Sequence, residues 1–149
     1  MPNGGHFVGE LNAEFKQHGE GVRFAADGSE SASGQWRNGK QNGQGKKSLP
    51  RGNRYEGDFV AGKSSGLGAY TWADGRVYEG EFRADTSNGF GIEWTAAGVM
   101  AKCGRWVKDN LVEPGPVPRS KIPIGSFLSA AGERHIREQP DDGLQSRIR

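Results

Sequence analysis

The sequence predicts an all-β protein, an elongated single-layer antiparallel meander of β-hairpin repeats. Three observations predict this class. Pairs of glycines recur about every 23 residues, aromatic residues alternate with charged ones, and only 33% of the 149 residues are hydrophobic while 25 are glycine. So few hydrophobic residues do not fill a thick globular core, whereas 9% aromatic residues are too many for a disordered chain.

The glycines keep a fixed frame along residues 6–110. Gly-x-Gly pairs begin at residues 19, 43, 66 and 89, a single glycine precedes each pair, and another follows each pair seven residues later. The preceding glycines are Gly9, Gly34, Gly57 and Gly80, with one more at Gly104, and the following ones are Gly28, Gly52, Gly75 and Gly98. The frame therefore comprises four full copies and the first half of a fifth.

Each copy predicts a hairpin. In the third copy, Tyr55, Gly57 and Phe59 alternate with Glu56 and Asp58, which is the period of a strand. The equivalent strands are expected over 7–11, 32–36, 78–82 and 102–106. A second strand begins at each Gly-x-Gly pair, and we expect the fifth copy to lack this strand.

Short turns join the expected strands. Residues 38–40 and 61–63 close two hairpins, and Asp27-Gly28 and Asp74-Gly75 supply the positive φ of turns between copies. The frame glycines and the rings occupy alternate positions of the same strands, so they are expected on the same face of the sheet. We therefore expect each missing side chain to leave space for a ring from a neighbouring strand, so that stacked copies share one ribbon-like core.

Residues 55–75, YEGDFVAGKSSGLGAYTWADG, followed by YEGEF at 78–82, resemble the MORN (membrane occupation and recognition nexus) repeat. The resemblance covers about residues 6–110. It implies an elongated single-layer antiparallel sheet that acts as a binding platform. MORN arrays serve in cytoskeletal and ciliary scaffolds and in membrane-junction proteins, and as modules of lipid kinases and lysine methyltransferases. No such catalytic domain fits in the 36 residues after Glu113.

The other copies depart from the third. Ala32 takes the tyrosine position of the second copy, and Lys47 and Leu49 replace two of its rings. Phe24 and Trp94 lie one position out of phase with the ring of the third copy. The glycine frame is intact in all of these copies, and the family resemblance rests on it.

A column of aromatic residues is the first candidate site. Its members are Phe7, Trp36, Tyr55, Phe59, Tyr70, Trp72, Tyr78, Phe82 and Trp106, and those from Trp36 onward are the candidate partner-binding residues. Two interpretations stay open. The rings pack on glycine backbone and hold the ribbon together, or part of the column forms an exposed groove for the apolar residues of a partner.

A basic stretch is the second candidate site. No acidic residue lies between Glu30 and Glu56, whereas six cations do: Arg37, Lys40, Lys46, Lys47, Arg51 and Arg54. Such residues bind anionic lipid head groups, or they solvate a hairpin. The net charge of +2 is too small for the footprint of a nucleic-acid-binding protein.

The sequence offers little for catalysis. His6, His18 and His135 lie in separate segments without metal-ligand spacing. Cys103 has no histidine near it in sequence, and no GxxxxGK[ST] phosphate loop is present. We therefore expect a protein that is not an enzyme and holds neither metal nor cofactor.

Other features bear on the compartment. A single cysteine cannot form an intrachain disulfide, no apolar run reaches the roughly 20 residues of a membrane span, and the N-terminus lacks the pattern of a secretory signal. These features predict a cytoplasmic protein.

After residue 110 we expect a proline-rich tail, 111–149. Pro114, Pro116, Pro118 and Pro123 favour an extended path, and a short helix is expected over 127–139. The apolar residues of the tail fold back over the aromatic face, reach into a partner, or stay unstructured; the sequence leaves these alternatives open.

The leading hypothesis is a non-catalytic scaffold or adapter that holds a partner protein within a cytoskeletal, ciliary or other assembly. The partner would lie in the aromatic groove or add to an edge strand near Phe7–Leu11 or Lys102–Val107. The alternative is a peripheral membrane adapter that binds anionic phospholipids through the basic stretch. A regulatory module acting beside an enzyme on another chain is a third, remote possibility.

Overall fold

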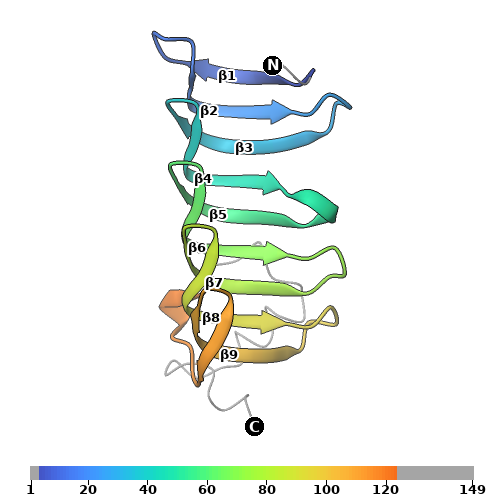
Figure 1. Ribbon diagram of the computed structural model, residues 1–149, viewed down its shortest axis with the longest axis vertical. Coiled ribbons are helices and arrows are strands. Elements are labelled where there is room, and N and C mark those ends of the chain that lie inside the picture. Colours follow the sequence, from blue (N-terminus) through green and yellow to red (C-terminus); the bar gives the residue numbers. More distant parts are fainter. Residues whose placement is uncertain (1–3, 124–149) are drawn as a thin grey trace.

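Ten antiparallel strands form one open sheet in which each strand pairs with its neighbours in sequence, from β1 to β10 (Figure 1). The computed structural model describes residues 4–123. The strands are β1 (His6–Leu11), β2 (Gln17–Phe24), β3 (Glu30–Arg37), β4 (Lys40–Ser48), β5 (Arg54–Val60), β6 (Lys63–Thr71), β7 (Val77–Arg83), β8 (Thr86–Trp94), β9 (Met100–Val107) and β10 (Asn110–Pro114). Within these residues, helical structure is confined to the 3₁₀ turns η1 (Pro50–Gly52) and η2 (Arg119–Lys121). The predicted single-layer all-β meander is confirmed.

A tenth strand completes the fifth hairpin, so the prediction that this copy lacks its second strand is wrong. β10 pairs with β9 through Asn110 and Val107 and through Leu111 and Trp106. No Gly-x-Gly pair marks this strand, because Pro114 lies opposite Gly104 where the other copies place glycine. The edges of the described sheet are therefore β1 and β10, and the predicted free edge at 102–107 is wrong as well.

A row of glycines, one from each of β1 to β9, crosses the sheet. Neighbours in the row lie directly opposite one another, and the members are Gly9, Gly21, Gly34, Gly45, Gly57, Gly68, Gly80, Gly91 and Gly104. A Cβ atom on Gly57 would lie only 2.5 Å from the carbonyl oxygen of Leu67 on the next strand. In each of the first four hairpins the register shifts directly after the row, which bends the strands there.

The hairpins from β3–β4 to β9–β10 close through turns with two consecutive residues at positive φ, as type I′ turns require, whereas the longer β1–β2 turn has one such residue, Phe15. Asn38 and Gly39 have φ of 50° and 86°, as the sequence predicts for residues 38–40. In the fourth hairpin, Ala84 and Asp85 occupy the same positions at 48° and 70°. Gly28 and Gly75 supply positive φ in turns between copies, as predicted.

The two faces of the sheet carry separate apolar clusters. On one face, which we call the groove face, the buried rings are Tyr55, Phe59, Tyr78, Phe82 and Trp106. On the opposite face, which we call the tail face, the cluster consists of Ile92, Trp94, Cys103, Val117 and Ile122. Strand alternation explains the separation, because a residue on one face is followed by a residue on the other.

The first part of the tail returns across the tail face. Val117 and Ile122 are 0% and 4% exposed and pack in the cluster that contains Ile92. The Lys121 ammonium lies 3.2 Å from the Glu81 carboxylate on β7. Of the alternatives for the tail, folding back is therefore correct for the described part, but the expected face is wrong. The apolar side chains of β8 and β9 against which it packs, Ile92, Trp94 and Cys103, point away from the aromatic column. The helix expected over 127–139 lies outside the described residues.

Candidate functional site

The rings of the groove face form a continuous zigzag along the array. Tyr55 lies edge-on to Phe59 and to Phe82, and Tyr78 lies edge-on to Phe82 and to Trp106. All four centroid separations fall between 5.0 and 5.2 Å, the range in which edge-to-face pairs attract. These five rings are at most 7% exposed, so they form the floor of the face rather than its rim.

Glycines of the row make room for the tyrosines of this floor. A Cβ atom on Gly68 would overlap the Tyr55 ring, and one on Gly91 would overlap the Tyr78 ring. Each tyrosine hydroxyl then donates a hydrogen bond to a main-chain carbonyl three residues ahead, at 2.8 Å for Tyr55 and 3.0 Å for Tyr78. Burial raises the pKa of both hydroxyls. The prediction that glycines accommodate neighbouring rings is confirmed at these positions.

Two hollows lie on this floor, one repeat apart. The N-terminal hollow has a volume of about 400 Å³ and is lined by Lys47, Leu49, Pro50, Arg51, Asn53, Tyr55, Phe59, Ser64, Tyr70 and Asp85. The C-terminal hollow has a volume of about 370 Å³ and is lined by Tyr70, Trp72, Tyr78, Phe82, Asp85, Ser87, Glu93, Trp106 and Asp109. Tyr70 and Asp85 line both, so the hollows adjoin and form one groove.

The rim between the two hollows is aromatic. Tyr70 and Trp72 are half-buried, and their rings lie 4.9 Å apart. The Asn53 side-chain amide donates a hydrogen bond to the Tyr70 hydroxyl at 3.0 Å, and the Arg76 guanidinium lies 4.5 Å from the centre of the Trp72 ring. These contacts fix the rim in place while part of each ring stays accessible to a ligand.

Serine–aspartate pairs form the polar wall of the groove. Asp85 Oδ1 accepts hydrogen bonds from the Ser64 backbone N–H at 2.8 Å and from the Ser64 hydroxyl at 3.2 Å. Asp109 Oδ1 accepts the same two bonds from Ser87, at 2.7 and 3.1 Å. Sequence analysis missed this wall. The signal was the replacement of Gly39 and Gly62 by aspartate at the equivalent turn positions of the fourth and fifth copies.

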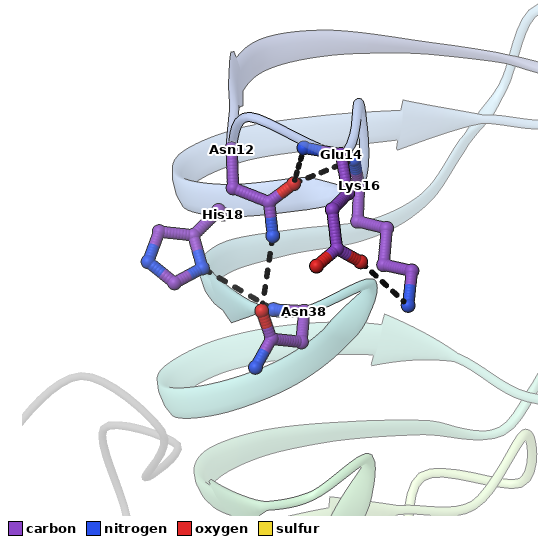
Figure 2. A network of polar contacts seen from close by, with 5 residues as sticks. All are labelled: Asn12, Glu14, Lys16, His18 and Asn38. Carbon is purple, nitrogen blue, oxygen red and sulfur yellow. Dashed lines mark hydrogen bonds and ion pairs between the residues drawn. The ribbon is translucent and has the colours of Figure 1, made fainter.

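The first hairpins are joined at the same edge by different residues (Figure 2). The Asn12 side chain donates to the Asn38 side-chain oxygen at 3.0 Å and accepts from the backbone N–H groups of Glu14 and Lys16. His18 Nδ1 accepts a 3.3 Å bond from the Asn38 backbone N–H. These residues are mostly exposed and lie far from the two hollows in sequence. This network therefore joins turns rather than contributing to the groove.

Most of the predicted aromatic residues belong to the groove, but Trp36 does not. Tyr55, Phe59, Tyr70, Trp72, Tyr78, Phe82 and Trp106 share one cluster. Trp36 is buried in the first two hairpins, where its ring lies 5.3 Å from Phe7 and 4.6 Å from the Arg23 guanidinium. Its indole N–H donates to the carbonyl of Gly21. The structure thus gives Trp36 and Phe7 the packing role that sequence analysis left open.

The six basic residues do not form one surface. Arg37 and Lys40 lie at the hairpin-turn ends of β3 and β4. Arg51 and Arg54 lie past the other end of β4, roughly 25 Å away at about 3.3 Å per residue. The two lysines between them point to opposite faces, because Lys47 lines the groove while Lys46 is the next residue in the strand and lies 4.0 Å from the Glu56 carboxylate.

Residues considered for catalysis lie in structural positions. Cys103 is 2% exposed, and burial raises the pKa of its thiol to about 11, which suppresses the reactive thiolate. His6 stacks on Phe24 at 4.8 Å, and His135 lies outside the described residues. Within residues 4–123, no group of three or more His, Cys, Asp or Glu side chains is arranged to hold a metal ion. No helix in this part of the chain has the length and apolarity needed to cross a membrane.

Comparison with known proteins identifies the repeats. A search of curated protein sequences gives no significant match. The family model of the MORN repeat matches at residues 33–54, 55–75 and 78–100, and each match covers most of one hairpin: β3–β4, β5–β6 and β7–β8. Repeats of this family generally take part in protein–protein or membrane–lipid interactions. Three consecutive matches, each on one hairpin of the meander, show that residues 33–100 of this chain form three MORN repeats.

Proposed function

We propose that the protein is a non-catalytic scaffold or adapter that holds a partner protein in the groove. The observation that carries this proposal is the pair of adjoining hollows, about 400 and 370 Å³, with an aromatic floor, a half-buried aromatic rim and a serine–aspartate wall. Aromatic anchors beside a few fixed polar groups are the features that dominate protein interfaces. In a cell the bound partner would link this chain to a cytoskeletal, ciliary or other multiprotein assembly.

The two faces of the sheet support the assignment of the groove as the binding surface. Val117 and Ile122 pack against Ile92, Trp94 and Cys103 on the tail face, so the described chain itself covers this apolar cluster. On the groove face, Tyr70 and Trp72 keep accessible ring surface. Burying such a ring under a partner removes apolar area from water, at roughly 25 cal/mol per Å².

Phospholipid binding through the basic stretch has less support. About 1 kcal/mol per basic residue is gained only where the residues approach one charged surface together. A flat membrane that contacts Lys46 on one face of the sheet cannot also contact Lys47, which lines the groove on the other face.

The proposal is tested with a double variant of the rim, Tyr70→Ala with Trp72→Ala. Phe59 is unsuitable because it is 3% exposed and its removal would destabilise the fold. Phe15→Ala is the matched control, since Phe15 is 83% exposed and lies in the turn after β1. Proteins captured by wild type are identified by mass spectrometry, and the binding of each purified candidate is then measured by calorimetry.

We expect the rim variant to bind the partner at least tenfold more weakly than wild type does, and the Phe15→Ala control to bind it with unchanged affinity. Circular dichroism checks that both variants stay folded. Equal affinity of the rim variant and wild type would contradict the proposal. A parallel sedimentation assay with liposomes containing phosphatidylserine, at low salt, tests the lipid alternative, because screening is weakest there.

A further inference from the structure

The two hollows are copies of one site. Lys47, Leu49, Tyr55, Phe59, Ser64 and Tyr70 of the N-terminal hollow recur 23 residues later as Tyr70, Trp72, Tyr78, Phe82, Ser87 and Glu93 of the C-terminal hollow. Asp85 corresponds to Asp109, which follows it by 24 residues. A ligand that occupies both hollows therefore meets the same floor and the same serine–aspartate wall twice.

The spacing of the two copies follows from the ring geometry. Tyr55 and Tyr78 both lie against Phe82, at 5.0 and 5.1 Å between centroids, so the equivalent tyrosines are at most about 10 Å apart. One repeat is two strands, and two inter-strand spacings amount to about 9.6 Å. The hollows thus repeat every 9–10 Å along the array.

Among regular peptide conformations, polyproline II best matches this spacing. It has three residues per turn and rises about 3.1 Å per residue, so side chains three residues apart lie on one side about 9.3 Å apart. An extended strand presents side chains on one side about every 6.7 Å. An α-helix presents them every 5–6 Å, or after two turns at about 10.8 Å, and it is 10–12 Å wide. Aromatic grooves are also the surfaces on which polyproline II ligands dock.

The charges of the groove give the ligand a polarity. The C-terminal hollow is lined by the carboxylates of Asp85, Glu93 and Asp109, and no basic residue within 4–123 lines it. The N-terminal hollow is lined by two basic residues, Lys47 and Arg51, and by one carboxylate, that of Asp85. A basic residue of the ligand is therefore favoured at the β9 end of the groove, and an acidic one at the β4 end.

We propose that the groove binds a proline-rich protein segment in the polyproline II conformation, with an apolar residue at every third position and a basic residue beside the C-terminal hollow. This inference rests on the proposed function, since it names the kind of partner that the same groove holds. The periodicity of the array and that of the ligand match, so successive apolar residues enter successive hollows without distortion of either chain. The preformed conformation of such a ligand also lowers the entropy lost on binding.

The probe is a fluorescein-labelled peptide of three Leu-Pro-Pro repeats followed by two arginines, and its affinity is measured by fluorescence anisotropy. The control peptide has Leu-Pro-Pro-Pro repeats, which keep the polyproline II conformation but move the leucines out of register with the hollows. We expect this control peptide to bind at least tenfold more weakly than the Leu-Pro-Pro peptide. Replacement of the arginines of the Leu-Pro-Pro peptide by glutamates should weaken binding to a similar degree. Trp72→Ala should abolish binding of the first peptide, and Phe15→Ala should leave it unchanged.

Equal affinity for the two spacings would overturn the inference, as would tighter binding of an alanine-rich helical peptide with leucines seven residues apart. The proposed function fails on a different result. If the rim variant loses its protein partner but no Leu-Pro-Pro peptide binds, the inference is wrong and the groove is still a protein-binding site. If the rim variant keeps the partner, the groove is not the binding surface and the proposed function is wrong.

Discussion

The carboxylate of Asp85 accepts hydrogen bonds from both the backbone N–H and the hydroxyl of Ser64, which lies one hairpin earlier in the array. In return, the Asp85 backbone N–H donates to the Ser64 carbonyl at 3.0 Å. Asp109 and Ser87 repeat the arrangement one hairpin later. Adjacent hairpins are thereby joined at their turns as well as through their strands, and the junction forms the wall of the groove.

Removing the Asp85 carboxylate should therefore loosen two hairpins at once. Hydrogen bonds to a charged acceptor contribute about 1.5–3 kcal/mol. The backbone strain of a residue with a Cβ atom at a φ of 70°, about 1 kcal/mol, is present in both Asp85 and its alanine replacement. We expect Asp85→Ala to lower the free energy of unfolding by about 2–3 kcal/mol, measured by urea denaturation. Asp85→Gly should cost about 1 kcal/mol less, because glycine adopts this φ readily. Equal stability of Asp85→Ala and wild type would show that the junction does not stabilise the array.

The space under the Tyr55 ring should not tolerate a methyl group. In Gly68→Ala the new Cβ atom would overlap the ring, so the ring must move and break its hydroxyl bond to the Asp58 carbonyl. We expect a loss of about 2–3 kcal/mol, measured by thermal unfolding. Gly115→Ala is the control, because no heavy atom lies within 4 Å of its new Cβ atom, and it should change stability by less than about 0.5 kcal/mol. If Gly68→Ala and Gly115→Ala lost equal stability, the space that Gly68 leaves for the Tyr55 ring would not be the reason for glycine at position 68.

The docking of the tail on the sheet can be measured through Val117. This side chain is fully buried in the cluster of the tail face, so Val117→Ala should destabilise the protein by about 1–3 kcal/mol. Val112→Ala is the control, since Val112 is 57% exposed on β10. Proteolysis followed by mass spectrometry should show faster cleavage after residue 114 in Val117→Ala alone. Identical cleavage of the two variants would mean that the return segment does not depend on this contact.

Cys103 makes the stability of the protein sensitive to alkaline pH. Burial raises the pKa of its thiol from 9.0 to about 11, so the folded state holds the proton more tightly than the unfolded chain does. The contribution of this group is fully present below pH 9 and is lost as the pH rises from 9 to 11, because the unfolded chain then releases its proton while the folded chain does not. The loss amounts to at most about 2–3 kcal/mol, at about 1.4 kcal/mol per pH unit.

The check is urea denaturation of wild type and Cys103→Ala at pH 7 and pH 10. We expect the stability gap between the two proteins to narrow at pH 10 by about 1 kcal/mol. Both proteins should also lose stability above pH 10, because burial raises the pKa of Tyr55 and Tyr78 as well. A gap that stays constant with pH would mean that the thiol titrates alike in the folded and unfolded chains.

The regular part of this protein could be predicted from its sequence, because glycine and ring positions repeat and each repeat folds alike. The placement of the Tyr55 ring over Gly68 follows from strand parity alone. β10 could not be predicted in this way, because its pairing with β9 places Pro114 where the frame has glycine. The face that the tail covers depends on Ile92 and Cys103, which lie opposite one another across two strands. The pairing of Gly91 with Gly104 places Ile92 and Cys103 on the face away from the rings, but it does not indicate which of the two faces the tail covers.

The candidate site was predictable in its rings but not in its polar wall. Tyr78 and Phe82 repeat Tyr55 and Phe59 at the same positions of the next copy, so a column of rings is visible in the sequence. Asp85 accepts hydrogen bonds from a serine 21 residues away, from a turn position at positive φ that is uncommon for residues other than glycine. Because the second and third copies have glycine at this turn position, the frame gave no reason to expect a side-chain acceptor there.

The glycine row has a consequence for how such a protein can change in length. Every strand from β1 to β9 crosses the row at a glycine, and the register shifts beside it in each of the first four hairpins, so the ribbon is creased lengthwise along one line like a gutter. The width and depth of this channel are determined by the bend within each hairpin and not by the number of hairpins. Duplication or loss of one 23-residue unit would therefore lengthen or shorten the channel by about 9.6 Å and leave its width and depth unchanged.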